Sequence, residues 1–336
     1  MQRKKILFIC GSHNQTTMMH QIAMHLGDHD LWFTPYYVDG VLDRLQRRGL
    51  LDFTIAGHAH QEATLRYLQQ QRLQIDNRGE RHTYDLIVTC SDLIVQRNIR
   101  NAPIVLVQEG MTDPENVFFY LSKYLGLPRY LASTSTTGLS DAYVRFCVAS
   151  DGYRELFVRK GADPSKVVVT GIPNFDNCIA YLDRPFEHRD HVLVATSDAR
   201  ETYKYENRRS FIYDCLDIAC GRTLVFKLHP NEDVGRATDE IRRHAPEAHV
   251  YPSGDVNAMI AHSSALITKY SSVVYIGLAL GKEVHSAFPL EQLRRLTPIQ
   301  NGGRSAINIA AVCREAMLDA APQQQHDSPM SYRLSV

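Results

Sequence analysis

The chain has 336 residues, and its 37 lysines and arginines equal its 37 acidic residues when histidine is neutral. This balance argues against bulk electrostatic binding to nucleic acid, which needs a basic surface. Apolar residues make up 44% of the chain, which is enough to fill the cores of two domains of ordinary size.

Short apolar runs alternate with longer amphipathic stretches along the whole chain. Ten runs are predicted to be strands: residues 5–10, 31–36, 85–89, 104–108, 146–149, 166–170, 191–196, 223–228, 249–251 and 265–267. Six stretches are predicted to be helices: residues 16–26, 62–73, 115–125, 151–160, 207–219 and 236–244. Several runs are undiluted Val, Ile and Leu, which is typical of strands covered on both faces of a parallel sheet. The alternation predicts α/β layers with right-handed crossovers.

A division is expected at residues 171–176, where the run VVVTGIP reads as a strand that ends in a turn. A polar break, PFEHRD, follows, and a new strand–helix series begins at residue 191. We therefore expect two doubly wound, Rossmann-like domains facing a cleft, an N-terminal one of residues 1–172 and a C-terminal one of residues 173–320. The Pro/Gln-rich residues 321–336 are expected to form a loose tail. Ligands of open α/β sheets bind beyond the carboxyl ends of the strands, so the motifs at those ends matter most.

Two strand ends in the first domain carry candidate residues. Gly11, Ser12 and His13 follow the first strand, where a small residue and a helix N-terminus suit an anion or a hydroxyl-rich group; a plain turn capped by Asn14 or Thr16 fits equally. Glu109 and Gly110 follow the run PIVLV. A carboxylate at such a strand tip is well placed to act as a general base. The alternative is a surface glutamate, with Asp113 and Glu115 as rival carboxylates.

Two further strand ends lie in the second domain. His229 is followed by Pro230, which stops the strand and leaves the imidazole where it can donate to a phosphate oxygen; a purely structural histidine is the alternative. Ser271 and Ser272 precede the helical-looking VVYIGLALGK and are expected to cap that helix, which would make an anion site. A serine pair that only caps a helix would share this geometry. Residues 196–200 could supply a hydroxyl and a guanidinium to a phosphate, or form a solvated loop.

Several common sites are missing from the sequence. It contains no G-x-x-x-x-G-K-[ST], G-x-S-x-G or G-x-G-x-x-G pattern. Nothing near the pair His58 and His60 completes a metal set, so no metal is expected. The seven cysteines are scattered without a C-x-x-C and are expected to be buried free thiols.

Together, these positions resemble the two-domain glycosyltransferases called GT-B. They are most similar to bacterial capsule and lipooligosaccharide enzymes, namely the sialyltransferase, polysialyltransferase and CDP-glycerol-type groups. Several of those families carry an acidic-residue–Gly, a His-Pro and a Ser-containing motif, which correspond here to Glu109-Gly110, His229-Pro230 and Ser271-Ser272. The acidic motif of those families has two acidic residues followed by Gly, whereas residues 108–110 of this chain read Gln-Glu-Gly. The resemblance implies that Glu109 is the base on an acceptor and that His229 and the serines hold the nucleotide phosphate.

These motifs together define the expected site. Catalytic roles are expected for Glu109 and His229. The residues expected to bind the donor are Thr196, Arg200, Lys227, His229, Pro230, Asn231, Tyr270, Ser271 and Ser272. The residues expected to bind the acceptor are Gly11, Ser12, His13, Gly110 and Asp113.

The nucleotide-sugar 2-epimerases share the same two-domain fold and are the second resemblance. Their His-Val-Glu-Ala-Gly segment is similar to residues 105–110, and their His-Pro-Asn segment to residues 229–231. Their Ser-Gly-Gly is Ser-Ser-Val at residues 271–273, and their His-Arg-x-Glu-Asn is only partly matched by residues 205–208. These two departures rank the epimerase second.

The sequence thus predicts a metal-independent, inverting glycosyltransferase without a cofactor. It would move a sugar from a nucleotide-activated donor to a glycan or lipid-linked acceptor in surface polysaccharide synthesis. The alternatives are a UDP-GlcNAc 2-epimerase-like enzyme, a polyol-phosphate transferase and a non-catalytic nucleotide-binding scaffold. No apolar stretch is long enough to span a bilayer, so a cytoplasmic protein is expected, or one at the inner membrane face. Residues 203–205 could contact a membrane peripherally or form an exposed loop. The nucleotide base, the sugar and the oligomeric state are not fixed by the sequence.

Overall fold

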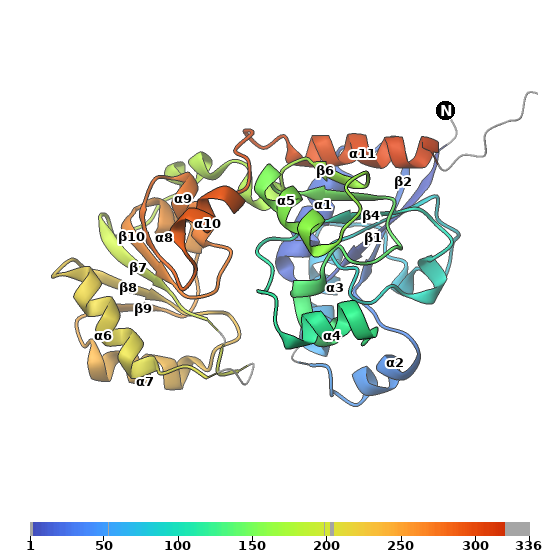
Figure 1. Cartoon of the computed structure of the whole chain (residues 1–336). Coiled ribbons are helices and arrows are strands. Elements are labelled where there is room, and N and C mark those ends of the chain that lie inside the picture. The colour runs from blue at the N-terminus through green and yellow to red at the C-terminus, as the bar shows by residue number, and fades with distance from the viewer. Residues whose placement is uncertain (1–2, 53, 198, 202–204, 320–336) are drawn as a thin grey trace, which may run out of the picture.

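The structure, a computed structural model, describes residues 3–52, 54–197, 199–201 and 205–319. The predicted tail and residues 203 and 204 lie outside the described residues. Figure 1 shows two α/β lobes side by side, each built around its own sheet. The predicted fold class, two doubly wound Rossmann-like domains, is confirmed.

The first sheet has six parallel strands in the order β2-β1-β3-β4-β5-β6. In chain order they are β1 (Lys5–Cys10), β2 (Asp30–Pro35), β3 (Leu86–Thr89), β4 (Ile104–Val107), β5 (Arg145–Val148) and β6 (Val167–Val169). All residues of β3 and β4 are buried, as their undiluted apolar sequences require.

The second sheet has five parallel strands in the order β11-β10-β7-β8-β9. They are β7 (His191–Ala195), β8 (Leu224–Lys227), β9 (His249–Tyr251), β10 (Ser263–Thr268) and β11 (Glu283–His285). Each of the ten predicted strands is present. The short edge strand β11 was not predicted, because its sequence, Glu-Val-His, has one apolar residue.

Helices link the strands. They are α1 (His13–Ala23), α2 (Gly40–Arg47), α3 (His58–Gln70), α4 (Val117–Leu125), α5 (Asp151–Lys160), α6 (Arg208–Ala219), α7 (Val234–His244), α8 (Val256–Ala261), α9 (Val274–Ala279), α10 (Leu290–Leu296) and α11 (Ser305–Asp319). The six predicted helices correspond to α1 and α3–α7, and the helical-looking segment after Ser272 contains α9. None of the helices in the described ranges is both long and apolar enough to cross a bilayer.

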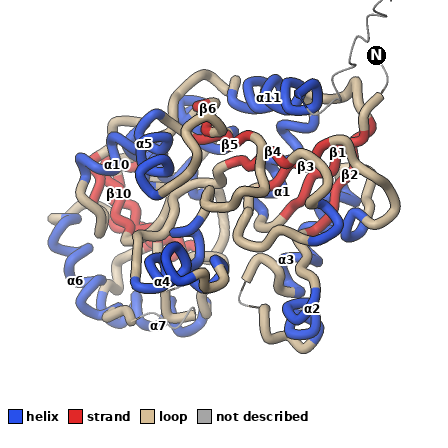
Figure 2. Tube along the Cα trace, turned by 45° about the vertical axis from the view of Figure 1, so that its right-hand side comes forward, coloured by secondary structure: helices blue, strands red, loops and turns tan. Residues whose placement is uncertain are grey.

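The last helix returns to the first domain. Helix α11 lies within the range predicted for the second domain, 173–320, but it packs against α1 and against strands β3, β4 and β5 of the first sheet. Figures 1 and 2 both show it beside that sheet. Buried residues such as Ile309, Cys313 and Ala316 recur at helical spacing and give α11 the apolar stripe that the sheet covers.

The two lobes touch along α5, α9 and α10. The hydroxyls of Tyr153 on α5 and Tyr275 on α9 are 2.6 Å apart and buried. Gly152 lies so close to α10 that an added Cβ would be 2.0 Å from the carbonyl oxygen of Arg295. The hydroxyl of Ser150 donates to the carbonyl of Leu296 at 3.2 Å. These contacts fix the mutual position of the strand ends that carry the candidate site.

Candidate functional site

Glu109 leaves the carboxyl end of β4, and the first helical turn of α1 holds its side chain. Ser12 Oγ donates to Glu109 Oε1 at 2.6 Å, and Gln15 Nε2 donates to Glu109 Oε2 at 2.6 Å. Short hydrogen bonds to an ionised acceptor are stronger than neutral ones. Both carboxylate oxygens are therefore oriented before any ligand arrives, while the residue stays partly exposed.

The sequence after β1 explains this arrangement. Ser12 is the N-cap of α1, and its hydroxyl also accepts from Gln15 N–H at 3.2 Å, so neither Asn14 nor Thr16 is the cap. A Cβ at Gly11 would lie 2.0 Å from Gln15 Oε1, so glycine at this position leaves room for the side-chain amide that donates to Glu109. Of the residues predicted to bind an acceptor, Gly11 and Ser12 thus build the Glu109 site. His13 is exposed, with its ring edge-on to Tyr67.

Gln108 and Asp92 are buried polar residues at the same carboxyl end of the sheet, and neither is among the predicted site residues. Gln108 Nε2 donates to the Gly110 carbonyl at 2.8 Å, and Gln108 Oε1 accepts from Ala149 N–H at 2.9 Å. The loop that carries Glu109 is thereby tied to the end of β5. Asp92, after β3, accepts from Arg129 Nη1 at 3.2 Å. The available signal for Gln108 was its place directly after an apolar strand, whereas Asp92 stands three residues after the end of β3.

The rival carboxylates have other hydrogen-bond partners. Asp113 Oδ2 accepts from Thr134 Oγ1 at 2.9 Å, which ties the loop after Glu109 to the 129–136 segment. Glu115 is exposed and accepts from the Tyr120 hydroxyl at 3.1 Å. Glu109 is the one of the three whose two carboxylate oxygens accept hydrogen bonds from the start of α1, while residues 111–115 line a cavity between the lobes.

His229 follows β8, as predicted, and its backbone is anchored twice. Its N–H donates to Thr196 Oγ1 and to Glu232 Oε2, both at 2.9 Å. The N–H of Asn231 donates to His229 Nδ1 at 3.3 Å. This contact helps to orient the His229 ring at the end of β8.

Ser271 and Ser272 do not cap α9 as predicted. The helix begins at Val274, and its N-cap, Val273, has helical backbone angles and no side-chain cap. Instead, Ser271 Oγ accepts from the Val273 N–H at 3.5 Å inside the turn. The helical turn starts earlier than a serine cap would allow, because Val274 N–H already bonds to the Ser271 carbonyl at 3.2 Å.

The serine loop reaches the first domain. A Cβ at Gly110 would lie 3.2 Å from Ser272 Cβ and 3.3 Å from Ser272 Oγ, so the two loops are in contact across the interface. Two motifs that are 161 residues apart in the sequence, Glu109-Gly110 and Ser271-Ser272, are thus brought together.

Other predicted donor residues already have partners within the protein. The pKa of Lys227 is lowered by burial, and its Nζ donates to the Leu228 carbonyl at 2.7 Å. Arg200 Nη1 donates to Glu240 at 2.9 Å. Tyr270 is 60% exposed and lies edge-on to Phe288. Their roles toward a donor stay predictions.

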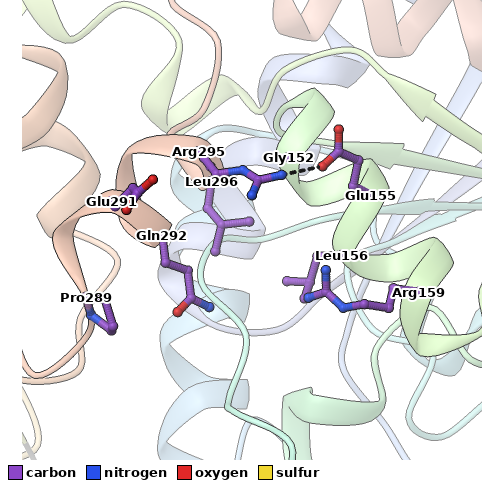
Figure 3. A pocket seen from close by; sticks show the side chains of 9 residues that line it. All are labelled: Gly152, Glu155, Leu156, Arg159, Pro289, Glu291, Gln292, Arg295 and Leu296. Atoms are coloured by element: carbon purple, nitrogen blue, oxygen red, sulfur yellow. Dashed lines mark hydrogen bonds and ion pairs between the residues drawn. The ribbon is translucent and has the colours of Figure 1, made fainter.

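Two cavities lie between the lobes, where α5 faces α10. One, of about 300 Å³, is lined by residues 111–115, α5, Tyr275 and α10. The other, of about 370 Å³, lies between α5 and α10, where Arg295 Nη2 and Glu155 Oε2 are 2.9 Å apart (Figure 3). Glu109 and His229 line neither cavity.

The comparisons with known proteins agree on the fold. No protein-family model matches the chain. No curated protein matches it either. Among solved structures, a UDP-GlcNAc 2-epimerase from Neisseria meningitidis bound to UDP-GlcNAc aligns over 93% of this chain and all of its own, with a TM-score of 0.57 and 12% identity. The chain has the GT-B fold.

Two further structures have the same architecture. The S. aureus MnaA–UDP co-structure aligns over 91% of this chain and 94% of its own, with a TM-score of 0.53 and 13% identity. The wall teichoic acid polymerase TagF aligns over 94% of this chain and 89% of its own, with a TM-score of 0.51 and 12% identity. At this identity the likeness carries the fold alone, so the chemistry must be argued from the site.

Proposed function

We propose that the chain is an enzyme acting on a nucleotide-activated sugar bound between its two domains. The contact between Gly110 and Ser272 carries the proposal, because it sets an oriented carboxylate against a hydroxyl-bearing turn of the other domain. Glu109 would act as the base. His229 and the serine loop would hold the nucleotide phosphates.

The arrangement suits a reaction in which a nucleotide leaves. Negative charge grows on the departing phosphate, and hydrogen-bond donors fixed in advance offset it, which is usually the largest contribution to catalysis. The His229 ring and the Ser271 and Ser272 hydroxyls would be such donors. No described step needs a metal, and metal independence stays part of the proposal.

The comparisons support epimerisation better than sugar transfer. UDP-GlcNAc 2-epimerases recur among the similar solved structures and have the higher TM-scores, for example 0.57 for the N. meningitidis enzyme against 0.51 for TagF. The alternative that ranked second on sequence therefore becomes the first reaction to test. In it, Glu109 would remove the proton from C2 as the C1–O bond to the nucleotide breaks, which leaves a C1–C2 double bond. A second acid would then deliver a proton to the opposite face of C2 while the nucleotide adds back at C1.

Transfer to a glycan or lipid-linked acceptor is the second candidate, for two reasons. The Ser-Ser-Val sequence stands where the epimerases have Ser-Gly-Gly. Inverting a carbon also needs proton exchange on both of its faces, whereas Asp113 and Glu115 are engaged by Thr134 and Tyr120. A transferase needs only one base, which Glu109 supplies.

Product analysis separates the two reactions. The protein is incubated with UDP-GlcNAc and with CMP-, CDP- and GDP-activated sugars, and ¹H and ³¹P NMR follow sugar and nucleotide. A 2-epimer still linked to its nucleotide, or released as the free sugar with UDP, indicates epimerase chemistry. Nucleotide release that leaves the sugar configuration at C2 unchanged indicates a transferase. Absence of both binding and turnover across the whole panel would refute the proposal.

A further inference from the structure

A buried ion cluster lies next to the loops that carry His229 and Ser271. It consists of Glu206, Arg208, Glu232 and Lys269. The side chains of Glu206, Arg208 and Glu232 are 2%, 3% and 0% exposed. Arg208 Nη2 donates to Glu232 Oε1, and Arg208 Nε lies 3.4 Å from Glu206 Oε1. Lys269 Nζ lies 3.5 Å from the same Glu206 oxygen.

The cluster joins the ends of three neighbouring strands. Glu232 Oε2 accepts from the Thr196 hydroxyl, just after β7, and from the His229 N–H, just after β8. Lys269 is the first residue after β10 and stands two residues before Ser271. Arg208 links the two carboxylates, because its guanidinium contacts both Glu232 and Glu206.

Fold stability alone does not explain this cluster. Taking charges out of water is expensive, and replacing a buried ion pair by apolar side chains of similar size is often neutral or stabilising. Arg208 Nη1 is moreover buried without a hydrogen-bond partner. The two carboxylates and two cations of the cluster balance in charge, so the fold tolerates it. What the cluster adds is a fixed conformation of the loops at the strand ends.

We propose that Glu232 and Arg208 are positioning residues, which hold the His229 loop in its phosphate-binding conformation. This inference rests on the proposed function of His229. Glu232 is the hub, since one oxygen fixes the His229 amide and the other takes the Arg208 guanidinium. Arg208 orients that carboxylate, and through Glu206 and Lys269 it extends the same constraint to the serine loop.

The test uses variants that leave no buried charge alone. Glu232→Gln with Arg208→Met removes both charges of the central pair, and Arg208→Lys keeps the charge but loses the forked geometry. Glu283→Gln is the matched control, since Glu283 forms an exposed pair with Arg222 in the same domain at 3.1 Å. Hydrogen exchange of the 227–233 peptide and the affinities for UDP, CDP, CMP and GDP are measured on the full chain. His229→Ala is measured alongside.

The double variant is expected to remain folded, to exchange the His229 amide at least about tenfold faster and to bind the nucleotide about tenfold more weakly. Arg208→Lys should fall between it and the wild type, and the control should match the wild type. Unchanged exchange in the double variant would overturn the inference, whether or not a nucleotide binds. So would faster exchange with unchanged affinity, if His229→Ala weakens binding. Failure of the wild type to bind any nucleotide would instead sink the proposed function, and the exchange measurement would still decide the positioning role.

Discussion

Replacing Glu109 with glutamine tests the proposed base with little change of shape. The carboxylate accepts one hydrogen bond from the Ser12 hydroxyl and one from the Gln15 amide, each at 2.6 Å. A glutamine oxygen can keep the bond from Gln15. Its NH₂ group then faces Ser12, whose hydroxyl can turn and accept. The fold should therefore lose at most about 1–2 kcal/mol, the usual net value of one or two hydrogen bonds.

Catalysis should suffer far more than stability. Loss of a general base costs about 10²–10⁴ in rate, which corresponds to about 3–5 kcal/mol of activation free energy. The assay is turnover of the nucleotide sugar that the wild type converts, with nucleotide affinity and melting temperature measured in parallel. Glu115→Gln is the control, because Glu115 is an exposed carboxylate close in the sequence that accepts a hydrogen bond from the Tyr120 hydroxyl. Turnover within a few-fold of wild type in the Glu109 variant would remove it as the base, as would equal losses in both variants.

Three further predictions concern packing and pH. Gly152→Ala should lower the free energy of unfolding by about 1–3 kcal/mol in urea titrations, because the new Cβ would meet the Arg295 carbonyl at 2.0 Å. Gly27→Ala has open space and should be tolerated, so equal stability of the two variants would contradict this close approach. Burial lowers the pKa of His191 to about 4, so the unfolded chain binds a proton at this residue before the folded chain does as pH falls below 6.5. Between that pH and pH 4, the free energy of unfolding of the wild type should fall by roughly 3 kcal/mol more than that of His191→Phe. Parallel stability curves of the two proteins against pH would refute this prediction. Burial lowers the pKa of Lys160 to about 8, so wild-type stability should rise relative to Lys160→Met by up to roughly 3 kcal/mol between pH 8 and 10.5, and a constant difference would argue against that shift.

The layered fold was predictable because its strands are nearly pure apolar runs. The sequences of β3 and β4 leave no alternative to strands buried on both faces, and the spacing between runs implies crossover helices. What escaped prediction depends on contacts far apart in sequence. Helix α11 follows the second domain in the chain but packs on the first, and only the tertiary structure shows which sheet covers its apolar stripe.

The sequence predicted the main residues of the candidate site but not the residues that orient them. Glu109 and His229 stand at strand ends as expected, yet Gln15 and Glu232, which orient them, look like ordinary polar residues in the sequence. The serine cap was wrong because the helical turn begins before a cap can form, a one-residue shift that propensity cannot resolve. Predicted phosphate ligands such as Lys227 turned out to have partners inside the protein.

A crystal structure of the chain with the nucleotide it binds most tightly tests the central claim most directly. We predict phosphate oxygens within hydrogen-bond distance of His229 Nε2 and of the Ser271 or Ser272 hydroxyl, on the side of the interface that faces Glu109. A nucleotide seated instead in the cavity between α5 and α10, with His229 and both serines out of reach of its phosphates, would contradict the account.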